Sequence, residues 1–158
     1  MTERFFLVDG PSLFYRAYHA ISHLSTSRGI PTNAVYGMNT MLWKILKEES
    51  PEFMGVAWDA PGPTLRHQVF EAYKGSRPGM PSDLVQQIPY VRRLLEALGL
   101  PLLECQGYEA DDILGTLVAR VDPLPVEVVL VTADKDLLQL VGPKVKAAQH
   151  QQGGEDLE

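Results

Sequence analysis

Short apolar runs alternate with amphipathic stretches along the 158-residue chain, and this alternation restricts the fold more than any other feature of the sequence. The apolar runs have the length of buried strands and are rich in β-branched and aromatic residues. They occupy 5–8, 53–58 and 126–132, with a weaker example at 102–105. The stretches between them carry helical patterns and end signals, and they span 13–20, 34–48, 82–98 and 110–120. Strands that alternate with helices predict an α/β fold, in which helices cover a parallel sheet.

Three segments depart from this pattern. Pro89 lies inside the third helical stretch and should kink or split it, because proline removes a helical hydrogen bond. Residues 64–81 fit neither the strand nor the helix period and end in glycines and prolines, so we expect a mobile excursion there. Residues 149–158 are polar and are expected to form a disordered tail. The sequence thus predicts one domain over residues 1–148, a length typical of a single domain.

Seven acidic residues follow the predicted strands or open the helix after one of them. They are Asp9, Asp59, Glu109, Asp111, Asp112, Asp134 and Asp136. The carboxyl ends of parallel strands meet at one edge of a sheet, so these side chains should gather there. Two like charges ~4 Å apart repel by about 4 kcal/mol at an effective dielectric near 20, and such a cluster therefore calls for cations. Hard oxygen ligands select Mg²⁺ or Mn²⁺, and a pair of these ions can assist displacement at a phosphodiester.

Each carboxylate also has a structural alternative, because an acidic residue at a helix N-terminus offsets the helix dipole. Asp112 fits either role equally, whereas the agreement of four strand ends favours metal binding for the other six. Other chemistries lack their motifs. The sequence has neither G-x-G-x-x-G nor G-x-x-x-x-G-K-[ST], and its four histidines and single Cys105 show no zinc spacing.

The net charge of -6 argues against a nucleic-acid partner until its distribution is considered. The segment 60–93 is basic, and within it Arg66, Lys74 and Arg77 are interleaved with Phe70 and Tyr73. Cationic groups can neutralise phosphates and an aromatic ring can stack on an unpaired base, although a solvated loop is the alternative. Arg16 could face the same site or the solvent. The lone cysteine and the lack of a signal peptide or membrane-length apolar run predict a cytoplasmic protein with no membrane partner.

Several short motifs occur in a fixed order between residues 4 and 145. They are LVDG at 7–10, YRAYHA at 15–20, PTNAVYG at 31–37, WDA at 58–60, RH at 66–67, YK at 73–74, RP at 77–78, GYEADD at 107–112 and TADKDLLQL at 132–140. In this order they resemble the 5'-3' exonuclease (5'-nuclease, flap endonuclease) domain found at the start of bacterial DNA polymerase I.

The resemblance implies a PIN-like, resolvase-like α/β domain that hydrolyses DNA near the 5' end of flaps, nicks and single strands with two divalent ions. Asp9, Asp59 and Asp111 would hold the first ion, Glu109, Asp134 and Asp136 would face the second, and Asp112 would support them. Residues 64–81 would form a helical arch around the 5' strand. DNA would be bound by Arg16, Arg66, Tyr73, Lys74 and Arg77, of which Lys74 and Arg77 would contact the scissile phosphate and act in catalysis with Asp9 and Asp59.

Two features depart from this family. Its members continue with a G-D-x-x-D-N-type segment, which supplies a further metal-binding aspartate, and with a helix-three-turn-helix, and the 158 residues contain neither. Ala133 also replaces a usual glycine. We therefore expect an incomplete second metal site. The alternatives are a truncated DNA-binding remnant with impaired catalysis and a PIN-type ribonuclease, and polymerase domains could follow in a longer native chain, which would act at the bacterial nucleoid.

Overall fold

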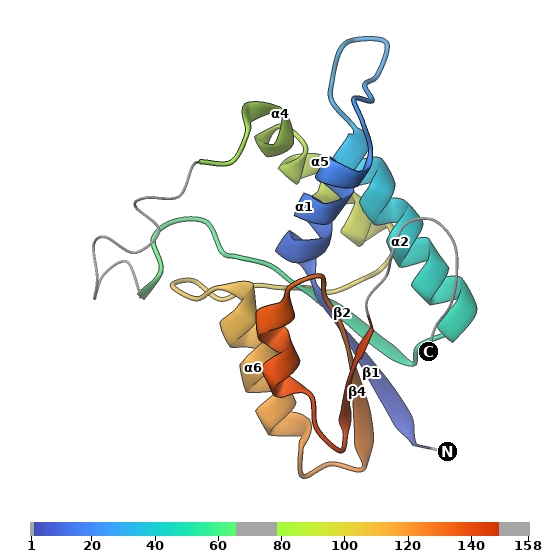
Figure 1. Ribbon diagram of the computed structural model, residues 1–158, viewed down its shortest axis with the longest axis vertical. Coiled ribbons are helices and arrows are strands. Elements are labelled where there is room, and N and C mark those ends of the chain that lie inside the picture. Colours follow the sequence, from blue (N-terminus) through green and yellow to red (C-terminus); the bar gives the residue numbers. More distant parts are fainter. Residues whose placement is uncertain (1, 66–78, 149–158) are drawn as a thin grey trace.

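The computed structural model describes residues 2–65 and 79–148, and its centre is a parallel five-stranded sheet (Figure 1). The strands are β1 (Glu3–Asp9), β2 (Phe53–Ala57), β3 (Leu102–Leu103), β4 (Val126–Val131) and β5 (Val145–Ala148), arranged in the order β3-β2-β1-β4-β5. The four strands expected from the apolar runs are confirmed, and so is the α/β fold. β5 was not predicted, because its four residues include the exposed Lys146 and show no apolar run.

The register of the sheet brings the ends of its central strands level. Asp9, the last residue of β1, pairs with Ala57, the last residue of β2. On the other side, Val8 pairs with Val131, the last residue of β4. The segments that follow these three strands consequently leave the sheet side by side, as parallel pairing requires.

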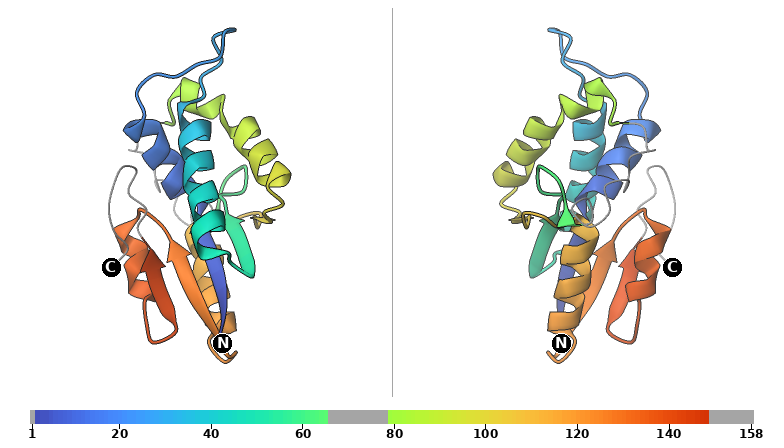
Figure 2. Two further views of the ribbon diagram at one scale, coloured as in Figure 1. Left: turned by 90° about the vertical axis from the view of Figure 1, so that its right-hand side faces the viewer. Right: turned by 90° about the vertical axis from the view of Figure 1, so that its left-hand side faces the viewer.

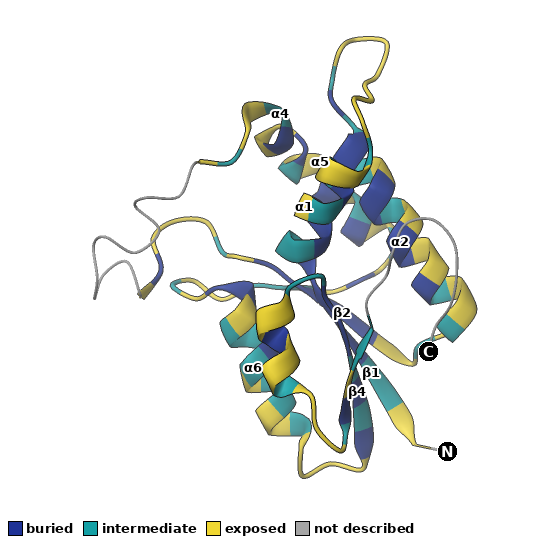
Figure 3. Ribbon diagram, in the orientation of Figure 1, coloured by how far each residue is buried: buried dark blue, intermediate teal, exposed yellow. Residues whose placement is uncertain are grey.

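Both faces of the sheet are covered, as expected for a parallel sheet. Side chains of β1 alternate between two cores: Phe6 and Val8 pack with α1 (Gly10–Ala20), α2 (Asn33–Glu49) and α5 (Ile88–Ala97), whereas Leu7 packs with α6 (Ala110–Val121) and the 3₁₀ turn η1 (Lys135–Leu140). In Figure 2, α2 lies in front of the sheet in one view and α6 in the other. Figure 3 shows the strands largely buried and the outer faces of the helices exposed.

The helical stretch around Pro89 is divided, as its sequence predicts. α4 (Ser82–Val85) ends before α5, and Pro89 stands in the first turn of α5, where no N–H is required. Gln87, between the two helices, is fully buried; its side-chain oxygen accepts from Ala34 N and Val35 N, and its amide nitrogen donates to Asn33 Oδ1. This side chain therefore satisfies the first N–H groups of α2 and fixes α4 and α5 against it.

Most of the segment expected as an arch, residues 66–78, and the expected tail, residues 149–158, lie outside the described residues. Among the helices of the described ranges, none combines the length and the apolar content that crossing a membrane requires.

Candidate metal centre

Three carboxylates from three separate elements converge at the carboxyl edge of the sheet. Asp9 ends β1, Asp111 lies in the first turn of α6, and Asp134 follows β4. One carboxylate oxygen of each lies within 4.8 Å of those of the other two. All three donors are hard oxygens, which is the type of ligand that Mg²⁺ and Mn²⁺ prefer.

Asp9 is the most buried member of this cluster, with 3% of its surface exposed. Its Oδ2 accepts a hydrogen bond from the Thr132 hydroxyl at 2.8 Å, and its Oδ1 accepts a long one from Ser12 N at 3.4 Å. Burial raises the pKa of Asp9 to about 6; the bond from Thr132 lowers it, and the charge of Asp111 raises it further. The negative charge is thus unfavourable at this position unless a cation offsets it.

Asp111 is exposed as a residue, but its carboxyl group is partly desolvated where it meets the sheet edge. This desolvation, followed by the charges of Asp134 and Asp59 and then those of Glu109 and Asp112, raises the pKa of Asp111. Four of the other predicted carboxylates therefore lie close enough to Asp111 to act on its carboxyl group.

Asp59, Glu109 and Asp112 are tied to the N-terminus of α6. Asp59 Oδ1 accepts from Ala110 N at 2.7 Å, and Asp112 Oδ2 accepts from Glu109 N at 3.0 Å as part of a capping box. Glu109 is buried and Asp59 is exposed. The structural role that the sequence allows for Asp112 is therefore present in the fold.

Asp134 and Asp136 shape the turn after β4. Asp134 is the N-cap of η1, and its Oδ1 accepts from Asp136 N at 2.9 Å. Asp134 belongs to the converging group of three, whereas Asp136 is exposed and lines a neighbouring groove. The resemblance places these two residues at one ion, and in the fold they are joined by this hydrogen bond within one turn.

Two hydroxyl residues of the site were missed by the sequence reasoning. Thr132, 1% exposed, donates to Asp9 and accepts from Asp134 N at 2.9 Å. Ser12 Oγ accepts from Ala133 N at 2.7 Å and so joins the start of α1 to the turn after β4. Thr132 opens the TADKDLLQL motif at 132–140, and Ser12 lies between two of the motifs that carry the resemblance. A serine or threonine near a helix start is common as a cap, so neither residue gives a separate signal.

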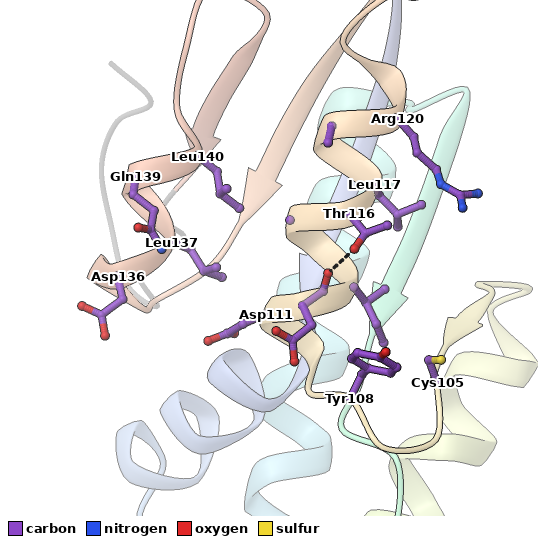
Figure 4. A pocket seen from close by; sticks show the side chains of 14 residues that line it. Cys105, Tyr108, Asp111, Thr116, Leu117, Arg120, Asp136, Leu137, Gln139 and Leu140 are labelled. Carbon is purple, nitrogen blue, oxygen red and sulfur yellow. Dashed lines mark hydrogen bonds between the residues drawn. The ribbon is translucent and has the colours of Figure 1, made fainter. Parts of the chain in front are cut away.

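A groove of about 1070 Å³ extends from the carboxylates along α6 and η1. Asp111 and Asp136 lie toward one end, with Tyr108 and Cys105 on the loop before α6, and Arg120 lies toward the other end (Figure 4). Between them the lining includes Leu117, Leu137 and Leu140. The groove is therefore acidic only near the sheet edge.

The predicted cationic residues are placed only in part. Arg16 is half-buried on α1, seven residues after Asp9, which is close to two helical turns and hence the same helix face. Helical side chains lean toward the N-terminus of their helix, which for α1 is the carboxylate edge. Arg66, Tyr73, Lys74 and Arg77 lie outside the described residues.

Comparison with known proteins identifies the family of this chain. Residues 4–157 match the family model described as the 5'-3' exonuclease, N-terminal resolvase-like domain. The chain is 46% identical to DNA polymerase I of Bacillus caldotenax over 100% of its own length and 18% of the polymerase. It is 43% identical to a 5'-3' exonuclease of Aquifex aeolicus over 89% of the chain and 48% of that protein. The chain thus spans less than half of either relative.

The fold is shared with a bacteriophage T5 flap endonuclease whose structure is a pseudo-enzyme–product complex with DNA and metal ions. The TM-score is 0.69 at 23% identity, over 93% of this chain and 55% of the T5 protein. At this identity the likeness concerns the fold alone. With the family match over nearly its whole length, the chain belongs to the 5'-3' exonuclease family, as an N-terminal resolvase-like domain.

Proposed function

We propose that this chain forms the metal-dependent centre of a 5'-3' exonuclease and flap endonuclease that hydrolyses DNA phosphodiesters. The observation that carries the proposal is the convergence of Asp9, Asp111 and Asp134 from three elements to within 4.8 Å. The relatives named as a 5'-3' exonuclease and as DNA polymerase I support the reaction and the choice of DNA as substrate.

The donor set fits a divalent metal ion. Asp9, Asp111 and Asp134 would hold one Mg²⁺ or Mn²⁺, because their oxygens are close and a cation would offset the cost of the buried Asp9 charge. The resemblance implies Asp59 rather than Asp134 at the first ion, and we propose Asp134 because its carboxylate oxygen belongs to the converging group. Asp59, Glu109 and Asp136 would serve a second site, with Asp112 supporting the start of α6.

A bound divalent ion would supply charge stabilisation at the phosphodiester and a lower pKa for an attacking water. The chain itself contributes the carboxylates. The Thr132 hydroxyl donates to Asp9, and Ser12 Oγ accepts from Ala133 N in the turn before Asp134. We propose that Lys74 and Arg77 contact the scissile phosphate, and that Arg16, Arg66 and Tyr73 bind the DNA strand. Cationic side chains at these positions would steer the phosphate backbone toward the acidic edge.

We further propose a 5' flap, a nick or a single-stranded 5' end as the site of action. Residues 1–148 would form the domain, residues 64–81 its arch and residues 149–158 a tail. Polymerase domains would be partners within a longer chain, as in the polymerase relatives. Because its substrate would be DNA, we propose that the protein acts at the nucleoid in the bacterial cytoplasm.

Incubation of 5'-labelled flap DNA with the purified chain and Mg²⁺ or Mn²⁺ tests the proposal. We expect cleavage near the 5' end by the wild type, and a loss of about 100-fold or more in Asp111→Asn, as for removal of a group that stabilises transition-state charge. Glu96→Gln, at an exposed position on α5, removes a similar charge elsewhere and should cleave normally.

Equal rates for wild type and Asp111→Asn would refute the nuclease centre. Calorimetry with Mn²⁺ separates the alternatives, because metal binding without cleavage would indicate a DNA-binding remnant. Faster cleavage of unpaired RNA than of flap DNA would indicate a ribonuclease.

A further inference from the structure

The Thr132 hydroxyl is shared between two of the three converging carboxylate residues. It donates its single proton to Asp9 Oδ2 at 2.8 Å and accepts from Asp134 N at 2.9 Å. Its distance to Ser12 Oγ is longer, at 3.4 Å. One oxygen atom therefore links the end of β1 to the turn after β4.

The hydroxyl of Thr132 is buried, so water cannot easily replace its hydrogen bonds. Thr132 is 1% exposed and Asp9 is 3% exposed, so bulk water has little access to either partner. A buried donor or acceptor that loses its partner costs its full desolvation free energy. Removal of the shared hydroxyl would therefore affect both Asp9 and the backbone of Asp134. Without it, the Asp9 carboxylate would keep only the long bond from Ser12 N among those described here, and Asp134 N would lose its acceptor.

We propose that Thr132 is a positioning residue for the metal centre, whose hydroxyl sets the orientation of the Asp9 carboxylate and the location of Asp134 together. The inference rests on the proposed metal-dependent function and adds to it a determinant of ion affinity. Groups that orient metal ligands by hydrogen bonding change metal affinity by about 10- to 100-fold when removed.

Ser12 supports the same region in a different way. Its Oγ accepts from Ala133 N at 2.7 Å and thereby joins α1 to the turn, whereas its bond to Asp9 comes from the backbone N–H, at 3.4 Å. Thr132 is thus the residue whose side chain reaches both a carboxylate oxygen and the backbone of a second carboxylate residue.

The test measures Mn²⁺ binding by calorimetry on the 158-residue chain, with Thr132→Val and Thr132→Ser. Valine keeps the shape and removes the hydroxyl, so we expect affinity to fall by about 10- to 100-fold. Serine keeps the hydroxyl and removes a methyl group, so affinity should stay within about threefold of wild type. Thr40→Val is the control, because Thr40 is exposed on α2 and its hydroxyl donates to Tyr36 O in the same helix.

Thermal unfolding in EDTA shows whether each variant is folded at the temperature of the titration. Wild-type affinity in folded Thr132→Val would overturn the inference, and so would a loss in Thr132→Ser as large as that of the valine variant. If Thr132→Val does not fold, Thr132→Ala, which also lacks the hydroxyl, takes its place in the comparison with Thr132→Ser. Absence of Mn²⁺ binding by the wild type would instead overturn the proposed function, which keeps the two failures apart.

Discussion

Replacing Asp9 by asparagine should stabilise the metal-free protein at neutral pH while removing its response to metal. The pKa of Asp9 is raised from 3.8 to about 6, chiefly by burial, so the folded state binds this proton more tightly than the unfolded chain does. The contribution of Asp9 to stability is therefore fully present below pH 3.8, its unfolded pKa, and is lost as pH rises through about 6. At neutral pH the difference between the unfolded and folded pKa values of Asp9 corresponds to about 3 kcal/mol of destabilisation.

Asparagine removes this charge and keeps the shape of the side chain. Its oxygen can accept from Ser12 N, and its amide can donate to Thr132, whose hydroxyl would then turn toward Ser12 Oγ. We allow about 1 kcal/mol for the weaker hydrogen bonds of a neutral group. The expected net gain near pH 8 is then about 2 kcal/mol, equivalent to about 4 to 8 °C in Tm for a domain of this size.

Urea unfolding in EDTA, repeated from about pH 4 to about pH 8, measures the difference between Asp9→Asn and wild type; it should grow by about 2 to 3 kcal/mol over this range. Glu96→Gln should show no comparable trend, because Glu96 is exposed on α5. Saturating Mg²⁺ should reverse the order, since a ligand at 100 times its Kd adds about 2.7 kcal/mol to the wild type alone. A difference that is flat with pH would refute the raised pKa.

Other changes test the packing around the site. Gly10→Ala should destabilise the fold by about 1 to 3 kcal/mol in urea unfolding, because a Cβ there would lie 2.3 Å from the Trp58 ring and 2.6 Å from Ala57 O; a gain in stability would contradict this close approach. Gln87→Leu should cost about 3 kcal/mol by leaving buried N–H groups of α2 without an acceptor, whereas Gln86→Leu, exposed beside it, should cost little; equal effects would count against the buried role. Cys105 is exposed and should react with a thiol reagent in the folded protein, and reaction only after addition of urea would disagree with its position.

The sequence predicts the central strands well because they are buried on both faces. Such strands consist of nearly continuous apolar residues, as 53–57 and 126–131 do. The strand β5 lies at the edge of the sheet beside β4 and exposes Lys146, so its pattern is weak. The 3₁₀ turn η1 has six residues and no helical period of its own, and it was therefore missed. A periodic apolar pattern arises from burial of one face or both. Elements at the edge of the fold bury few side chains and therefore show a weak pattern.

The meeting of the carboxylates at one edge could also be predicted, since it follows from parallel strands that end level. The sequence could not indicate which three converge, because that depends on turns and side-chain bonds. Asp59 bonds to Ala110 N, and Asp134 is held by Thr132. Neither contact produces a periodic pattern in the sequence. The first joins residues that are far apart in the chain, and the second lies within one tight turn.

Backbone groups at the same edge of the sheet offset part of the repulsion within the acidic cluster. Three of the carboxylates, Asp9, Glu109 and Asp134, are the N-cap residues of α1, α6 and η1. The N-termini of these elements therefore lie at the acidic edge, where their unpaired N–H groups and partial positive charge offset part of the repulsion. Asp111 lies in the first turn of α6 but is not its N-cap residue. Burial and then the charges of its acidic neighbours raise its pKa. Metal binding would add to this backbone stabilisation at Asp9 and Asp134, and at Asp111 it would supply what the backbone does not.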